Sequence, residues 1–130
     1  MLICGATGLI KGRQVTTHWS AHHLLPFFGA VPVNKRVVVD GNMVFAAGVT
    51  SGIDGALYVA AQLRGDEVAK AIQLDMQYAP KPPFDSGTPE SAPADLVDAV
   101  RHSFEDITAR REQTARRIAE RLGVSAPAGT

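Results

Sequence analysis

The chain has 130 residues, which is enough to bury the hydrophobic core of one domain of ordinary size. Its 13 basic and 13 acidic side chains cancel, which excludes the strong net field typical of proteins that bind nucleic acid or an anionic membrane. Hydrophobic residues make up 45% of the chain, but no apolar run reaches the roughly 18 residues that a membrane-spanning helix needs.

The cysteine content and the first residues indicate a cellular compartment. A single cysteine, Cys4, excludes a disulfide within the chain. The first residues lack the basic segment and the long apolar stretch of a secretory signal peptide. We therefore expect a cytoplasmic protein with a reduced thiol, and neither nucleic acid nor a membrane among its partners.

The first part of the chain predicts a helix, a short strand and a second helix. Residues 1–11 are apolar from the start and lack an N-cap, and Gly12 ends this pattern. Residues 14–18 have the β-branched centre that is typical of a strand. Residues 19–28 carry apolar side chains at helical spacings, with Ser20 as a candidate N-cap and Pro26 close to the end.

A β-hairpin is predicted at residues 36–47, where two apolar runs flank the turn sequence Asp-Gly-Asn at residues 40–42. The small residues 48–52 follow the second run and open a helix whose apolar stripe extends from Ile53 to Leu63. A strand, a turn of small residues and a helix together form the building block of α/β proteins, and the exposed amides of such a turn can meet a ligand.

The remainder of the chain predicts helices around a stiff connection. A helix is expected at residues 66–78, and five prolines between residues 79 and 93 predict an irregular, stiff segment. Apolar positions at helical spacing predict a long amphipathic C-terminal helix at residues 94–122, followed by a flexible tail at residues 123–130.

These elements include only about three strands, two of which form the hairpin. A doubly wound sheet normally has about five or more strands with helices on both faces. An apolar sheet edge would therefore lie open unless another element covered it. We expect an α/β fold with an incomplete sheet.

Three segments at ordered spacing carry a resemblance to a known family. They are GATGLIKGRQVTTHW at residues 5–19, AGVTSGID at residues 47–54 and YAPKPPFDSGTPE at residues 78–90. Together they resemble the C-terminal part of the ThiJ/PfpI superfamily, a group related to class I glutamine amidotransferases. The proline-rich third segment most resembles the isonitrile hydratases.

The resemblance implies a flavodoxin-like, three-layer α/β sandwich in which residues 1–122 form the C-terminal part of the domain. In this family a cysteine on a strained strand-to-helix turn is the nucleophile, and residues 2–11 resemble the helix that leaves this turn. The nucleophile, and the acidic residue that isonitrile hydratases use, would then fall before Met1. We therefore expect the sequence to be the incomplete C-terminal part of such a protein, as a gene fragment or through a late start codon.

Cys4 does not match that nucleophile. It lies one residue before Gly5, at a position that the family fills with apolar residues, and no neighbouring charge would activate its thiol. We expect Cys4 to be a buried small hydrophobic side chain, with a nucleophilic role as the alternative.

The histidines differ in the roles that the sequence suggests for them. His18 matches the histidine that faces the cysteine in many superfamily members and can orient or deprotonate it, which makes it the catalytic candidate. A base also needs a group to act on, so shared ancestry and actual proton transfer are separate hypotheses for His18. His22 and His23 are adjacent and would point about 100° apart on a helix, so we expect no metal site there. We also expect no cofactor.

The resemblance also suggests residues that bind substrate. Trp19 is either a pocket wall or a part of the core or of a dimer surface. Val49, Thr50 and Ser51 match the turn beside the family's active site, and the alternative is that Ser or Thr there only caps a helix.

The resemblance implies an isonitrile hydratase-like activity in the complete enzyme, the addition of water to an isonitrile to give an N-substituted formamide. It implies a small-molecule substrate and a homodimer. The alternative is a non-catalytic ligand-sensing domain related to AraC-type transcription regulators.

Overall fold

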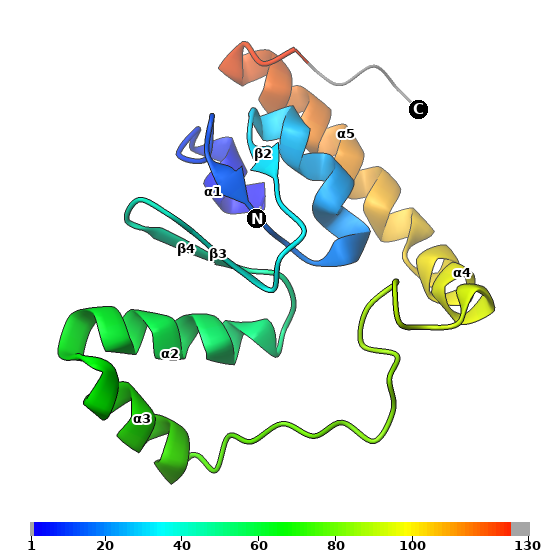
Figure 1. The fold of residues 1–130 in the computed structure, drawn as a ribbon. Helices are drawn as coiled ribbons and strands as arrows, with labels where there is room; N and C mark the ends of the chain where they lie inside the picture. Colours follow the sequence, from blue (N-terminus) through cyan, green and yellow to red (C-terminus); the bar gives the residue numbers. More distant parts are fainter. Residues whose placement is uncertain (1, 126–130) are drawn as a thin grey trace.

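The computed structural model describes residues 2–125 as a mixed α/β arrangement (Figure 1). The helices are α1 (Leu2–Ala6), η1 (Trp19–Phe28), α2 (Ser51–Arg64), α3 (Asp66–Asp75), α4 (Ala94–Ser103) and α5 (Glu105–Leu122). The strands are β1 (Gln14–Val15), β2 (Val31–Pro32), β3 (Val37–Asp40) and β4 (Met43–Ala46). No helix within residues 2–125 is long and apolar enough to cross a membrane.

The strands form two separate ladders. β1 and β2 are parallel, with Val15 opposite Pro32, and β3 and β4 are antiparallel, with Asp40 opposite Met43. The β1–β2 pair was not anticipated from the sequence, because β2 has two residues and one of them is a proline. The predicted α/β class with few strands is confirmed.

The predicted hairpin is also confirmed. β3 and β4 are joined at Gly41 and Asn42, and Gly41 adopts a φ of 61°, which an L side chain rarely adopts. Asp40 connects this hairpin to β1, because its carboxylate accepts a hydrogen bond of 2.6 Å from the backbone N–H of Gln14 and one of 3.3 Å from the guanidinium of Arg13. The hairpin is thereby held against the strand that leads to His18.

η1 is a 3-10 helix over its whole length, and its start differs from the expectation. Ser20 was predicted as the N-cap, but the N-cap is His18, whose ring accepts a hydrogen bond from the Ser20 backbone N–H. The helix ends at Gly29, which has a φ of 68° and donates its N–H to the Pro26 carbonyl. The sequence could not show this start, because imidazole capping is rarer than capping by a hydroxyl.

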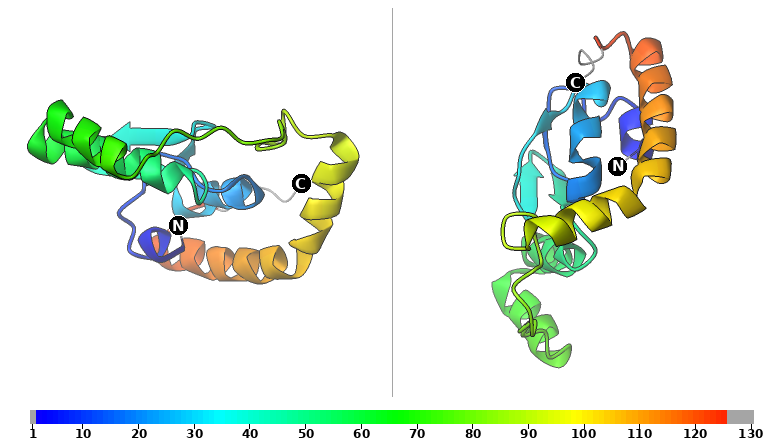
Figure 2. Two further views of the ribbon diagram at one scale, coloured as in Figure 1. Left: turned by 90° about the horizontal axis from the view of Figure 1, so that it is seen from below. Right: turned by 90° about the vertical axis from the view of Figure 1, so that its right-hand side faces the viewer.

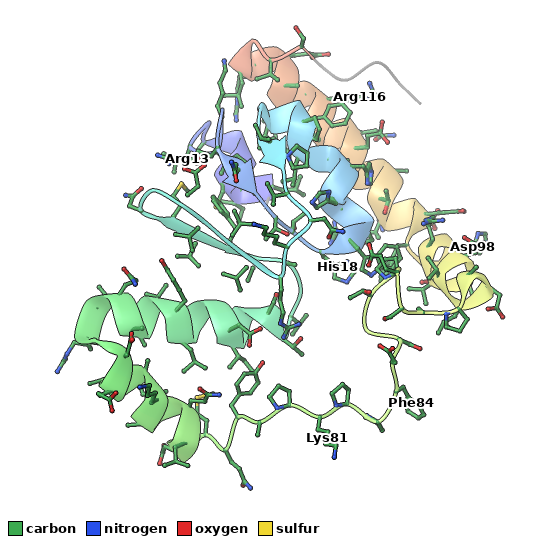
Figure 3. The ribbon with its side chains drawn as sticks, in the orientation of Figure 1. Arg13, His18, Lys81, Phe84, Asp98 and Arg116 are labelled. Carbon is green, nitrogen blue, oxygen red and sulfur yellow. The ribbon has the colours of Figure 1, made fainter. Side chains whose placement is uncertain are left out.

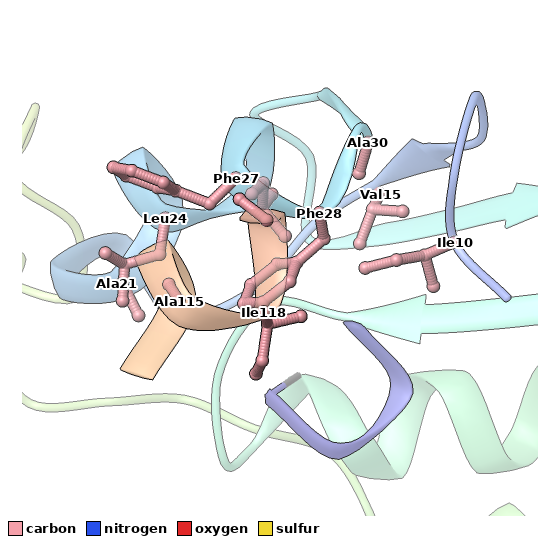
Figure 4. Close-up of a cluster of buried hydrophobic side chains, with 11 residues drawn as sticks. Ile10, Val15, Ala21, Leu24, Phe27, Phe28, Ala30, Ala115 and Ile118 are labelled. Atoms are coloured by element: carbon pink, nitrogen blue, oxygen red, sulfur yellow. The ribbon is translucent and has the colours of Figure 1, made fainter. Parts of the chain in front are cut away.

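The core lies where α5 packs against η1 (Figure 4). From η1, Leu24, Leu25 and Phe28 are fully buried, and from α5 the small side chains of Ala115 and Ala119 allow the two helices to approach closely. Ile10, Val15 and Ala30 extend this cluster toward β1 and β2.

α1 is shorter than predicted. A helix was expected over residues 2–11, but α1 ends at Ala6 and turns follow, with a φ of 76° at Gly8. Gly5 is buried against the Phe28 ring: a Cβ at Gly5 would lie 2.5 Å from Phe28 Cδ1. Only glycine fits here without a shift of the core.

The predicted long C-terminal helix is interrupted at Phe104. α4 ends and α5 begins at this residue, and Figure 2 shows the two helices meeting at a corner. The hydrophobic periodicity continues through residues 94–122, so no local pattern indicates a bend. The reason is tertiary, because the Phe104 ring packs against His18 and Trp19.

The end of α5 is capped by residues that the sequence had placed in a tail. Gly123 and Val124 donate backbone hydrogen bonds to the carbonyls of Glu120 and Ala119, and Val124 packs on the core. Residues 126–130 of the predicted flexible tail lie outside the described residues.

A substitution at Gly5 tests the close contact with Phe28. We expect Gly5→Ala to lower the free energy of unfolding by about 1–3 kcal/mol, because the new methyl group overlaps the buried ring. Urea denaturation measures this change. Gly52→Ala is the matched control: nothing lies within 4 Å of a Cβ there, so stability should be unchanged or rise by up to about 1 kcal/mol. Equal stability of Gly5→Ala and the parent chain would contradict the packing described here.

Candidate functional site

A cavity of about 750 Å³ brings together segments that are far apart in the sequence. Its walls come from residues 17–19, His22, residues 34–36, residues 47–51, residues 87–90 and Arg101. The five residues singled out in the sequence, His18, Trp19, Val49, Thr50 and Ser51, all lie beside this cavity. Figure 3 shows His18 near the loop that leads into α4, while Lys81 and Phe84 project away from the body of the molecule.

The hydrogen bonds of His18 determine what its ring can do. His18 Nδ1 lies 3.3 Å from the Ser20 backbone nitrogen, from which it accepts a hydrogen bond, and 2.9 Å from Ser20 Oγ. Because the Ser20 N–H requires a lone pair on Nδ1, the proton of the neutral ring is carried by Nε2. In this arrangement His18 presents a hydrogen-bond donor, and it can accept a proton only by giving up the cap.

Aromatic rings hold His18 in place. The ring centroid of Trp19 lies 5.6 Å from that of His18, and the Phe104 ring meets both edge-on, at 6.1 Å from His18 and 6.3 Å from Trp19. Trp19 also borders a second cavity of about 130 Å³ against α4. The Trp19 ring therefore borders both cavities, and its role in binding substrate stays a prediction.

The turn before α2 supplies another wall. Val49 is 94% exposed. Ser51 is 1% exposed, and its hydroxyl accepts from the Gly48 N–H at 2.6 Å and donates to the Gly48 carbonyl at 2.7 Å. The Ser51 side chain thus closes the turn, and Thr50, the N-cap residue of α2, makes no capping hydrogen bond with its side chain.

A network of polar side chains fixes Arg36 at the cavity wall. Arg36 Nε donates to Asp54, Arg36 Nη2 donates to Thr50 Oγ1 at 3.2 Å, and the Tyr78 hydroxyl donates to Asp54 at 2.7 Å. The hydrogen bond from Tyr78, followed by that from Arg36, lowers the pKa of Asp54. The hydrogen bond to Asp54 raises the pKa values of both Arg36 and Tyr78.

These shifts have a defined dependence on pH. Because the folded pKa of Asp54 lies below its unfolded value, its contribution to stability is present above the unfolded pKa and is lost as pH falls through the folded pKa. Because the folded pKa of Tyr78 is raised, its contribution is complete below the unfolded pKa and is lost as pH rises through the folded one.

The loop at residues 87–90 forms the remaining wall, and the sequence analysis did not assign it to the site. Glu90 accepts a hydrogen bond of 3.2 Å from Asn34 Nδ2. Bonds from its own backbone N–H, then from Thr88 and Asn34, lower the pKa of Glu90. The only signal in the sequence was that this loop belongs to the third segment of the family resemblance.

Cys4 does not lie at this cavity. It borders a separate cavity of about 180 Å³, together with residues of β1 and β4. The expectation that Cys4 is buried was wrong, because its thiol is exposed on α1. The physical reason is that α1 turns the neighbouring Gly5, and not Cys4, toward Phe28.

The two adjacent histidines differ in their surroundings. His22 borders the large cavity, and its Nε2 is buried without a hydrogen-bond partner among residues 2–125, whereas His23 is exposed. Within residues 2–125 no group of three or more His, Cys, Asp or Glu side chains could hold a metal ion.

The ionisation of Tyr78 tests the network. Tyr58→Phe leaves Tyr78 as the single tyrosine, because the chain has two. In that background we expect Asp54→Asn to lower the pKa of Tyr78, since the carboxylate that holds the phenol proton is gone. The ultraviolet absorbance of tyrosinate as a function of pH measures this shift. An unchanged titration curve would show that the Tyr78–Asp54 hydrogen bond does not form in solution.

Comparison with known proteins gives this geometry a context. No family model matches the chain. The chain is 46% identical over 123 residues to an isonitrile hydratase of Pseudomonas putida, a match that covers 95% of this chain and 54% of the relative. It is 35% identical over 75 residues to Protein DJ-1alpha of Drosophila melanogaster, covering 58% of this chain and 35% of that protein.

A solved structure supports the same relation. The crystal structure of a ThiJ/PfpI family protein from Pseudomonas syringae matches with a TM-score of 0.84 and 41% identity, over 88% of this chain and 47% of that one. The chain therefore spans about half the length of these two relatives. The resemblance to the ThiJ/PfpI superfamily is confirmed: over 95% of its length this chain is a homologue of part of an isonitrile hydratase, and it shares the fold of part of a ThiJ/PfpI family protein.

Proposed function

We propose that the large cavity forms part of an isonitrile hydratase site. The observation that carries this proposal is that the three segments resembling the family, far apart in the sequence, converge on one cavity. The identity of 46% to an isonitrile hydratase supports the same activity. The candidates carried over from the resemblance are His18 as the catalytic residue and Trp19, Val49, Thr50 and Ser51 as residues that bind substrate.

The proposed reaction is the addition of water to an isonitrile, R–NC + H₂O → R–NH–CHO. A thiolate attacks the isonitrile carbon, an acid protonates that carbon, and water then adds and releases the thiol. Cys4 is not at the cavity, so in this proposal this chain does not supply the thiol, and the acid is the acidic residue that the resemblance implies. The proposal thus assigns to this chain the walls and the hydrogen-bond donors of the site.

The role that the geometry gives His18 is that of a donor. Its Nε2–H is available because Nδ1 is engaged by Ser20. Such a donor can orient the attacking water or bind the formamide oxygen that forms. The role of Ser51 in this proposal is to hold the backbone of the turn in place, because its hydroxyl bonds to the N–H and the carbonyl of Gly48.

The homodimer implied by the resemblance and the cytoplasmic location expected from the sequence are also part of this proposal. The structural support for association is the exposed apolar surface of α2 and α3, where Leu63 is 74% and Leu74 81% exposed. Sedimentation velocity measures the oligomeric state directly.

The activity is tested most sharply by a chimera. In the Pseudomonas putida enzyme, the part that matches this chain is replaced by this chain, and formamide production from cyclohexyl isonitrile is followed. We expect the chimera to be active and His18→Ala to lower its kcat by about 10²-fold or more, as loss of a donor in the active site does.

The 130-residue chain alone and Cys4→Ser serve as controls. We expect no hydration by the chain alone and full activity of the chimera with Cys4→Ser. Hydration by the chain alone that Cys4→Ser abolishes would make Cys4 the nucleophile and contradict this proposal. Binding of isonitrile by a chimera that hydrates none would favour the ligand-sensing alternative.

A further inference from the structure

The charged side chains around the large cavity are predominantly cationic. Lys35, Arg36 and Arg101 line it, and Glu90 is the single acidic residue among its walls. Three cations and one carboxylate at one cavity favour an anionic ligand, provided that the cations are not all neutralised by neighbours.

The neighbours of these side chains determine which of the charges are still available to a ligand. Glu90 is held within its own loop and by Asn34, so its carboxylate is already supplied with donors. Arg101 is paired with Asp98 at 3.0 Å. Among the described residues, Lys35 has no carboxylate within 4 Å, so its ammonium group stays available to a ligand.

Arg36 is held rigidly but retains free donors. Two of the five guanidinium N–H groups are donated to Asp54 and Thr50, and the Tyr78 hydroxyl also interacts with the guanidinium, which leaves at least two N–H groups for a ligand. Asp54 is in turn fixed by the Tyr78 hydroxyl. A guanidinium that is fixed in this way can bind a carboxylate without losing further side-chain entropy.

We propose that the isonitriles taken by this cavity carry a carboxylate on their substituent, with Arg36 as the residue that determines this specificity and Lys35 as a second cation. This inference rests on the proposed function and defines its substrate class. The carboxylate stays unchanged in the reaction: ⁻OOC–R–NC and water give ⁻OOC–R–NH–CHO, an N-formyl amino acid when R is a single carbon.

Product binding tests the inference without requiring catalysis. The probes are N-formylglycine, which carries the carboxylate, and its neutral methyl ester, and calorimetry measures their affinities for the 130-residue chain at low ionic strength. We expect the carboxylate to bind about tenfold more tightly than the ester. We expect Arg36→Gln to reduce this preference to about threefold or less, and added salt to reduce it further.

Two further variants serve as references. Lys35→Gln alters an exposed side chain without a structural partner and should reduce the preference about threefold without changing the fold. Arg64→Gln removes an exposed cation of α2 that does not line the cavity and should leave the preference unchanged. Thermal unfolding of each variant shows whether a loss of binding reflects a loss of the fold.

Several outcomes would overturn the inference. These are equal affinities for the two probes, no binding of either, or a preference that is undiminished in Arg36→Gln. The chimera separates this failure from that of the proposed function. If the chimera hydrates cyclohexyl isonitrile and isocyanoacetate at equal rates, only the carboxylate specificity fails. If it hydrates neither compound, the proposed function fails.

Discussion

The packing of α5 against η1 is the contact on which the candidate site depends. η1 begins at the cavity with the capping His18 and with Trp19, and the Phe104 ring at the start of α5 packs against both. Deeper in the molecule, Ala115 and Ala119 allow the approach of η1, and Gly5 makes room for the ring of Phe28. A change in that core would therefore displace the aromatic wall of the cavity.

The second constraint is the attachment of the proline-rich segment to the body of the molecule by hydrogen bonds near its two ends. At the start of this segment the Tyr78 hydroxyl donates a hydrogen bond to Asp54, which also pairs with Arg36. Near its end Glu90 accepts a hydrogen bond from Asn34. Both ends are thus attached near residues 34–36, the segment that enters β3. This arrangement explains how a segment without regular secondary structure forms part of a cavity wall (Figure 1).

The sequence predicted those features that depend on neighbouring residues. The hairpin follows from two apolar runs around residues 40–42, and α2 follows from its turn and apolar stripe. The resemblance assigns His18, Trp19 and residues 49–51 to one site, and all of them lie beside one cavity.

What the sequence could not predict depends on contacts between distant residues. The interruption at Phe104 arises from its packing on His18 and Trp19, and the exposure of Cys4 arises from the contact of Gly5 with Phe28. The tautomer of His18 depends on a hydrogen bond whose partner, Ser20, had been expected to be the cap itself. No periodicity encodes such contacts.

Trp19, the single tryptophan of the chain, serves as a fluorescent probe of the cavity in a ligand titration. We expect N-formylglycine to change the fluorescence of Trp19 in a saturable way, and the NMR signals of His18 and of the Thr50 amide to shift with the same dissociation constant. A Trp19 signal that stays constant, or that changes without saturation while His18 and Thr50 are unaffected, would contradict the claim that these residues form one ligand site.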